Sequence, residues 1–140
     1  MRAPRPSHTA APLRQIETMG RDFPQFRYRA LRDGGLLWSG ALRPTSSSPR
    51  YKVSVLHQPG RVPKVFVRQP KLPGDTPHRY DDGSLCVFWP EEFRWNDSEL
   101  LAKTLLPWAA FWLFYVEIWQ ITGEWMGPEA PHAKKETSAT

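Results

Sequence analysis

The sequence predicts an α+β domain in which a short N-terminal helix is followed by a four-stranded antiparallel meander, an irregular loop and a long C-terminal helix. Three observations lead to this prediction. Strand-like runs separated by turn residues follow one another between residues 26 and 67, the pattern of a meander. Apolar residues at helical spacing flank these runs on both sides. The 140 residues include 15 prolines, which argue against a helical bundle because each removes a backbone donor and fixes φ.

The N-terminal region is expected to pass from a loose tail into the first helix. Residues 1–12 are rich in proline, alanine and arginine and are interpreted as a disordered tail. Leu13, Ile16 and Met19 follow at helical spacing, which predicts a short amphipathic helix. We expect this helix to end at Pro24, because the residue before a proline is disfavoured in the α conformation.

Four short runs with the signature of strands come next. The first two are joined by Asp33-Gly34-Gly35, a hairpin signal. In the third run, Tyr51, Val53 and Val55 alternate with polar residues, which predicts a half-buried strand. Because each run follows the previous one across a turn or loop, we expect a sheet with its strands in chain order. The strands are predicted at residues 26–31, 36–42, 51–57 and 62–67.

The longest apolar segment of the chain predicts a helix near the C-terminus. Asn96 is a suitable cap, and Glu99 follows three residues later in a capping-box pattern. Apolar residues at helical spacing continue to residue 121, and Gly123 marks the end of the helix. We expect this helix to cover one face of the sheet.

A membrane span is the alternative interpretation of this segment. Residues 105–121 have about the minimum length that a span requires. Pro107 and Gln120 interrupt and close the run, and Glu117 lies inside it. A carboxylate at the centre of a span costs about 2.5–3.5 kcal/mol on insertion scales. A core helix is therefore the preferred interpretation, and no membrane association is expected.

Size and composition indicate one domain, expected over residues 13–132, with a second loose tail over 133–140. A domain of this size can bury a core without help from a metal or a disulfide. The single cysteine excludes an intramolecular disulfide and favours a reducing, cytoplasmic location. The arginines near the N-terminus are not followed by a continuous apolar stretch, so no secretory signal is expected.

The net charge of +5 is unevenly distributed. Residues 1–80 hold 15 Lys and Arg against 4 Asp and Glu, a net +11, whereas residues 81–140 hold 4 against 10, a net −6. A basic half suits an acidic partner or nucleic acid, but it is about as often a solvated face with a basic tail. The arginines lack the aromatic interleaving of a single-strand binding groove, so nucleic acid is not the expected partner.

The candidate site lies in the irregular stretch of residues 70–90, which contains the only cysteine. Within this stretch, Asp82-Gly83 predicts a tight turn, and Cys86 follows in a short extended piece. A nucleophilic cysteine needs partial exposure and a polar or positive neighbour, for which His78 and Arg79 are candidates. A lone cysteine is also compatible with a buried hydrophobic role, which is the commoner one.

This stretch resembles the active-site segment of ubiquitin-conjugating enzymes. In that family a His-Pro-Asn triplet precedes a Gly-x-x-Cys-Leu sequence, after a four-stranded meander. Thr76-Pro77-His78 stands at the position of the triplet, and Gly83-Ser84-Leu85-Cys86-Val87 matches the second motif. The resemblance covers roughly residues 13–125 and implies a UBC-like fold with a thioester-forming thiol at Cys86.

The resemblance also implies roles for the other residues of this loop. His78 stands where the family has asparagine, and it could donate a hydrogen bond to an oxyanion, act as a base on an incoming amine, or only cap the loop. No metal is expected, because the His and Cys residues lack zinc-site spacing. The residues expected to shape the active-site loop are Thr76, Pro77, Tyr80, Asp81, Asp82 and Gly83.

Residues 108–132 are similar to bacterial UBC-like proteins, some of which are encoded in anti-phage signalling operons beside cGAS-like nucleotidyltransferases. This similarity implies that the cargo is the C-terminus of such a nucleotidyltransferase. Glu129 and His132 could fold back toward the thiol or belong to a plain tail. The sequence has no glycine-rich phosphate loop, so no cofactor is expected, and an upstream adenylating enzyme or a pre-formed thioester must supply the acyl group.

Two other functions stay open. A catalytically inactive UBC-like module would keep the fold and bind its partner without chemistry, which the departures at Thr76 and His78 allow. An adaptor attached to a membrane or to nucleic acid would use the long apolar helix or the basic half of the chain. Over both of these alternatives, the sequence favours the thioester-forming acyl carrier, acting on a partner protein in bacterial antiviral defence.

Overall fold

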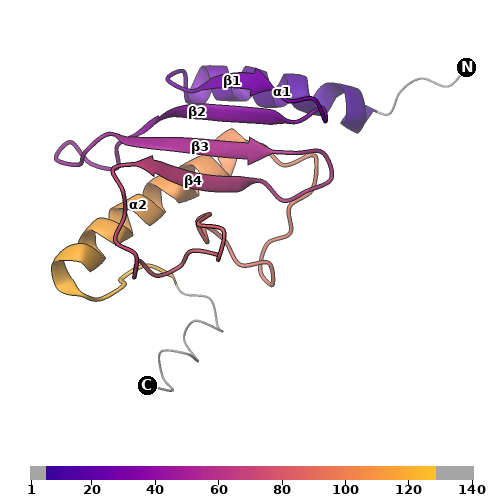
Figure 1. The fold of residues 1–140 in the computed structure, drawn as a ribbon. Helices are drawn as coiled ribbons and strands as arrows, with labels where there is room; N and C mark the ends of the chain where they lie inside the picture. The colour runs from indigo at the N-terminus through magenta and orange to yellow at the C-terminus, as the bar shows by residue number, and fades with distance from the viewer. Residues whose placement is uncertain (1–5, 129–140) are drawn as a thin grey trace, which may run out of the picture.

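The computed structural model describes residues 6–128 of the chain. The tail predicted at 133–140, and the fold-back considered for Glu129 and His132, lie outside the described residues. The elements occur in the predicted order and form the predicted α+β, UBC-like arrangement (Figure 1). They are α1 (Pro6–Asp22), β1 (Arg27–Ala30), β2 (Leu36–Leu42), β3 (Tyr51–His57), β4 (Lys64–Gln69), the short 3₁₀ helix η1 (Leu101–Lys103) and α2 (Leu105–Thr122).

The sheet is the antiparallel meander expected from the sequence, with strand order β1-β2-β3-β4. The second and third strands have the predicted bounds, and the first and fourth differ from them by one or two residues. In the first hairpin, the Gly35 N–H donates to the Asp33 carboxylate at 2.8 Å, and Gly34 has a φ of 88°. A positive φ strains a residue with a side chain, so glycine is well suited to this turn.

One face of the sheet and one side of α2 form the core. In the third strand Tyr51, Val53 and Val55 are buried as predicted, but Ser54 is buried as well, so the alternation is only partly right. Figure 1 shows α2 crossing behind β3 and β4, and the buried side chains of these elements belong to one cluster. The predicted role of this helix as a core helix is therefore confirmed. Its buried residues are Leu105, Leu106, Ala109, Trp112, Leu113 and Val116.

Glu117 lies within this apolar helix because two hydroxyl groups satisfy its carboxylate. Ser48 Oγ donates to Glu117 Oε1 at 2.9 Å, and Tyr51 Oη donates to Oε2 at 3.0 Å. Burial, together with the neighbouring carboxylate, raises the pKa of the Tyr51 phenol, which therefore stays protonated and able to donate. Within residues 6–128, no helix is long and apolar enough to cross a membrane.

The first helix begins at Pro6 and not near Leu13, so residues 6–12 are helical where a tail was expected. Proline suits the first helical position, because its missing N–H is not needed there. The expected apolar stripe is only partly right, since Met19 is buried but Leu13 is 68% exposed. The most deeply buried polar residue of this helix is Gln15, which periodicity of apolar residues alone does not reveal.

The start of the last helix is also corrected. The helix predicted from Asn96 begins at Leu105, and the segment before it contains turns and η1. Pro107 explains the difference, because a helix running through it from residue 96 would lose the bond to residue 103 and clash with that carbonyl. As the third residue of α2, Pro107 needs no intrahelical partner. The end at Gly123 is confirmed, with a φ of 80° and its N–H donating to the Trp119 carbonyl at 2.7 Å.

Candidate active site

A short hairpin beyond the β4 edge of the sheet holds the cysteine (Figure 1). The Cys86 N–H donates to the His78 carbonyl at 2.9 Å, and the Tyr80 N–H donates to the Ser84 carbonyl at 2.8 Å. The turn between these strands is tight, as predicted, with Gly83 at a φ of 88° and its N–H donating to the Tyr80 carbonyl at 2.9 Å. The backbone on either side of the thiol is therefore fixed by pairing within the loop.

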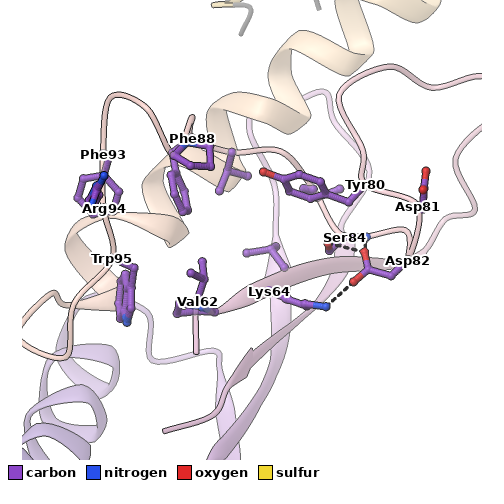
Figure 2. Close-up of a pocket in the computed structure, with 15 residues that line it drawn as sticks. Val62, Lys64, Tyr80, Asp81, Asp82, Ser84, Phe88, Phe93, Arg94 and Trp95 are labelled. Atoms are coloured by element: carbon purple, nitrogen blue, oxygen red, sulfur yellow. Dashed lines mark hydrogen bonds and ion pairs between the residues drawn. The ribbon is translucent and has the colours of Figure 1, made fainter. Parts of the chain in front are cut away.

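Two interactions attach this hairpin to the sheet. The Leu85 N–H donates to the Val65 carbonyl of β4 at 2.8 Å. Lys64 Nζ lies 2.6 Å from Asp82 Oδ2, while Asp82 Oδ1 accepts the Ser84 N–H at 2.9 Å and Ser84 Oγ at 2.6 Å (Figure 2). The Lys64 hydrogen bond, followed by those from Ser84, holds the pKa of the Asp82 carboxyl far below its usual range. Asp82 thus joins the turn both to Ser84 and to β4.

The segment before the hairpin folds back on itself. Thr76 is buried, and its hydroxyl donates to the Pro73 carbonyl at 2.6 Å. Arg79 Nη2 donates to the same carbonyl at 3.0 Å and to that of Gly74 at 3.4 Å. The Arg79 guanidinium therefore braces this loop, in which Pro77 follows Thr76, and it is not the positive neighbour of the thiol that the sequence suggested.

His78 connects the hairpin to the C-terminal part of the domain. Its φ is 58°, a left-handed conformation that is uncommon outside glycine. Its carbonyl accepts the Trp112 Nε1–H at 3.2 Å in addition to the Cys86 N–H. Its ring lies against that of Trp125, with 4.6 Å between ring centroids. Contacts on its backbone and on its ring thus hold His78 in place.

The thiol of Cys86 is partly buried and has a polar neighbour. Burial raises the pKa of the Cys86 thiol above its ordinary value, and a hydrogen bond from the Tyr80 hydroxyl acts in the opposite direction without cancelling the increase. Burial, together with the same hydrogen bond, raises the pKa of Tyr80 to about 12. Tyr80 therefore keeps its proton at neutral pH and is the donor in this pair.

The thiol opens onto an aromatic groove with a volume of about 460 Å³. The groove lies between the segment that follows the thiol, one side of α2 and the turn after α2. Among the lining residues within 6–128, Glu92 is the only charged one. The lining comprises Cys86, Val87, Phe88, Trp89, Glu92, Phe93, Trp108, Phe111, Trp112, Tyr115, Trp125 and Pro128.

A second groove, with a volume of about 790 Å³, lies on the other side of the same segment. Figure 2 shows Tyr80, Asp81 and Asp82 at one end of it, and Phe93 and Trp95 at the other. Asp81 is exposed here, so its side chain lies on the outside of the hairpin. The two grooves share the lining residues Val87, Phe88 and Phe93.

Sequence reasoning missed the aromatic residues that line the thiol groove. Trp108 and Trp112 lie in the apolar run from which the last helix was predicted, and Trp125 lies beyond that run. The only local signal was the position of Trp125 two residues after the helix-ending Gly123, where the chain reverses. Within the described part of the chain, no three His, Cys, Asp or Glu side chains form a group that could hold a metal ion.

The chain matches one of the known protein families. A family described as Type II CBASS E2 protein matches residues 15–133. The chain belongs to this family. The E2-like protein is therefore of the kind found in anti-phage CBASS operons, and the resemblance seen in the sequence is confirmed. A search of the curated proteins gives no match. Membership of this family implies a protein partner within the CBASS system.

Proposed function

We propose that the E2-like protein carries the C-terminus of a partner protein as a thioester on Cys86. The observation that supports this most directly is the position of the thiol: a partly exposed sulfur, fixed by the hairpin, at the edge of a groove large enough for several side chains. A reactive cysteine requires such access together with a polar neighbour, and Tyr80 supplies the neighbour.

The proposed reaction has two steps. In the first, the Cys86 thiolate attacks the carbonyl carbon of an activated C-terminus, the S–C bond forms, and the activating group leaves with its electron pair. In the second, the amine of an acceptor attacks the same carbon, the C–S bond breaks, and its electrons return to the sulfur. The proton of the amine passes to solvent. The activated acyl group comes from an adenylating enzyme or from another thioester.

The lining of the thiol groove suggests the chemistry of the cargo. Aromatic walls bury apolar side chains well, at about 25 cal/mol for each Å² of apolar surface removed from water. Glu92 is the only charged residue in the described part of the lining, so it favours a basic group along the bound segment. The groove therefore suits an extended C-terminal segment with large apolar side chains and a nearby Lys or Arg. In a CBASS operon, we expect this segment to be the C-terminus of the cGAS-like nucleotidyltransferase.

His78 could act in this reaction in two ways. Its ring is packed on Trp125 and its carbonyl accepts two hydrogen bonds, which suits a residue that shapes the loop. A ring N–H directed at the bound carbonyl would instead stabilise the oxyanion. A His78→Asn variant distinguishes these roles, because asparagine restores the family residue with its own donor. The oxyanion role would be supported if His78→Asn forms as much adduct as the wild type and His78→Ala forms less.

The test of the proposal is adduct formation with the neighbouring nucleotidyltransferase. We expect the wild type, co-expressed with the operon proteins, to give a covalent adduct that dithiothreitol releases. Cys86→Ser should give an oxyester that resists dithiothreitol but yields to hydroxide, and Cys86→Ala should give no adduct. A wild-type protein that forms no adduct under these conditions would contradict the carrier function.

An inactive binding module is the second candidate, and one observation favours it. Burial raises the pKa of the Cys86 thiol, so only a small fraction is thiolate at neutral pH unless a bound partner changes its surroundings. In this case Cys86→Ala would keep both partner binding and phage defence. Measuring the two together separates the candidates, because a carrier loses defence while it keeps binding.

A further inference from the structure

Tyr80 and Cys86 lie diagonally across the hairpin. Cys86 is paired with His78, and Tyr80 is paired with Ser84, so Tyr80 lies two positions along the strand from the residue that faces the cysteine. Diagonal neighbours on one face of an antiparallel pair lie within reach of an aromatic side chain. This register places the Tyr80 side chain on the same face of the hairpin as the Cys86 thiol, within reach of it.

The backbone of Tyr80 is held on both sides. Its N–H donates to Ser84 and its carbonyl accepts from Gly83, so it belongs to the tightest part of the turn. The Lys64–Asp82 ion pair attaches that turn to β4. Figure 2 shows the Tyr80 ring extended along the larger groove, with its hydroxyl directed away from Asp81 and Asp82. The hydroxyl is thus not engaged by these carboxylates.

We propose that the Tyr80 hydroxyl is the hydrogen-bond donor to the Cys86 sulfur, both when the thiolate attacks and when it leaves. The second half of this inference rests on the proposed thioester function, whereas the first concerns the free thiol alone. In the attack, the O–H stabilises the thiolate that forms the S–C bond. In the transfer, the same O–H donates to the sulfur and stabilises the negative charge that grows there as the C–S bond breaks.

Two properties of the site support this assignment. The sulfur is partly buried, so water solvates a thiolate there poorly, and a fixed donor replaces some of that lost solvation. Arg79, the nearest cation in sequence, is occupied with the loop carbonyls. Besides Cys86, the titratable groups among the described lining residues of the thiol groove are Glu92 and Tyr115, while His78 and Tyr80 belong to the hairpin itself.

The experiment is a pH profile of alkylation of the full chain by iodoacetamide. The chain has a single cysteine, so the rate reports Cys86 alone. For Tyr80→Phe we expect the midpoint to rise by about one pH unit, the usual effect of a hydrogen bond to a charged acceptor. At pH 7 the rate should fall about threefold, because the thiolate fraction falls about tenfold while the more basic thiolate is about three times as nucleophilic. An unchanged or lower midpoint overturns the proposal.

Two controls separate the hydroxyl from the shape of the loop. Tyr28 is about as exposed as Tyr80, at 49% against 46%, but its ring packs on Trp38 in the sheet. Tyr28→Phe should leave the alkylation profile unchanged. Replacing the tyrosines by 3-fluorotyrosine, whose hydroxyl is the stronger donor, should lower the midpoint in the wild type but not in Tyr80→Phe. If the midpoint of the wild type is the same with tyrosine and with 3-fluorotyrosine, the proposal is overturned, even if Tyr80→Phe folds poorly.

The transfer step needs its own measurement. With the thioester adduct isolated, its discharge by added lysine should be several-fold slower in Tyr80→Phe than in the wild type, since a more basic thiolate leaves more slowly. Equal discharge rates overturn the role in leaving. Failure to obtain any adduct contradicts the proposed function instead, and the alkylation profile still decides whether Tyr80 stabilises the thiolate.

Discussion

The His78 ring packs on the Trp125 ring with 4.6 Å between centroids and 45° between planes. Trp125 also contacts Trp112 and Tyr115, at centroid distances of 5.6 and 6.1 Å. The turn after α2 therefore covers the residue that stands in place of the family's asparagine, and it closes one end of the thiol groove. Trp125, which is distant from His78 in the sequence, therefore helps to fix the conformation of the active-site loop.

We expect Trp125→Ala to destabilise the domain and to open the groove. The loss of three aromatic contacts should lower the free energy of unfolding by about 1–3 kcal/mol. Cys86 should react faster with iodoacetamide because the groove widens, while adduct formation falls because His78 is no longer held. Urea denaturation and alkylation rates measure these effects. Met126→Ala, at the exposed neighbouring residue, is the matched control and should change neither. Unchanged alkylation in Trp125→Ala would show that Trp125 does not cover the thiol.

The side chain of Gln15 joins α1 to the segment before α2. Its Nε2 donates to the Glu99 carbonyl at 2.7 Å, and its Oε1 accepts the Leu101 N–H at 3.0 Å. Gln15→Ala leaves a buried donor and a partly buried acceptor without partners, so we expect a loss of about 2–3 kcal/mol in the free energy of unfolding. Chemical denaturation measures the loss. Leu13→Ala, on the exposed side of the same helix, should cost little, and an equal cost for both variants would contradict the bridging role.

The carboxylate of Glu117 provides a test of the buried polar cluster. We expect Glu117→Ala to leave the Tyr51 hydroxyl without its acceptor, whereas the Ser48 hydroxyl keeps its contact with Thr45 Oγ1 at 2.7 Å. Tyr51→Phe removes only one donor. A double-mutant cycle between positions 51 and 117 should give a coupling energy of about 1.5–3 kcal/mol, the range for a hydrogen bond to a charged group. Unfolding curves of the two single variants and the double variant supply the numbers. Additive effects would contradict the hydrogen bond between Tyr51 and Glu117.

The predictability of the fold depended on how local each determinant is. The bounds of β2 and β3 could be predicted because side-chain alternation and adjacent turn residues define them. The start of α2 could not, because the steric effect of Pro107 outweighed the capping pattern at Asn96. The start of α1 was missed because its proline-rich composition is typical of a tail, whereas the helix begins at Pro6, in a position that proline favours, and continues through Pro12.

The candidate site shows the same division between local and distant determinants. The hairpin around Cys86 was predictable, since its turn, its glycine and its thiol lie within a few residues of one another. The partners of His78 were not, because Trp112 and Trp125 follow it by more than thirty residues in the chain. The role of Arg79 was misjudged because its charge is visible in the sequence, but the Pro73 carbonyl that it binds is not.

His57, at the end of β3, is a half-buried histidine next to Trp95. Their ring centroids are 5.5 Å apart, and His57 Nε2 is buried without a hydrogen-bond partner. Burial lowers the pKa of His57 below its ordinary value of 6.5, and the charge of Asp97 opposes this shift only in part. The folded state thus binds the proton less readily than the unfolded state does.

This difference in proton affinity makes stability depend on pH. Because the unfolded state takes up the proton first, the free energy of unfolding should fall as the pH drops from about 6.5 through the lower pKa of His57 in the folded state. Above this window, both states are neutral at His57 and its contribution is constant. In His57→Phe we expect a flatter curve between pH 7 and 5, which urea denaturation at several pH values measures. Parallel curves for the two proteins would show that His57 titrates alike in both states and that its burial carries no pH-dependent cost.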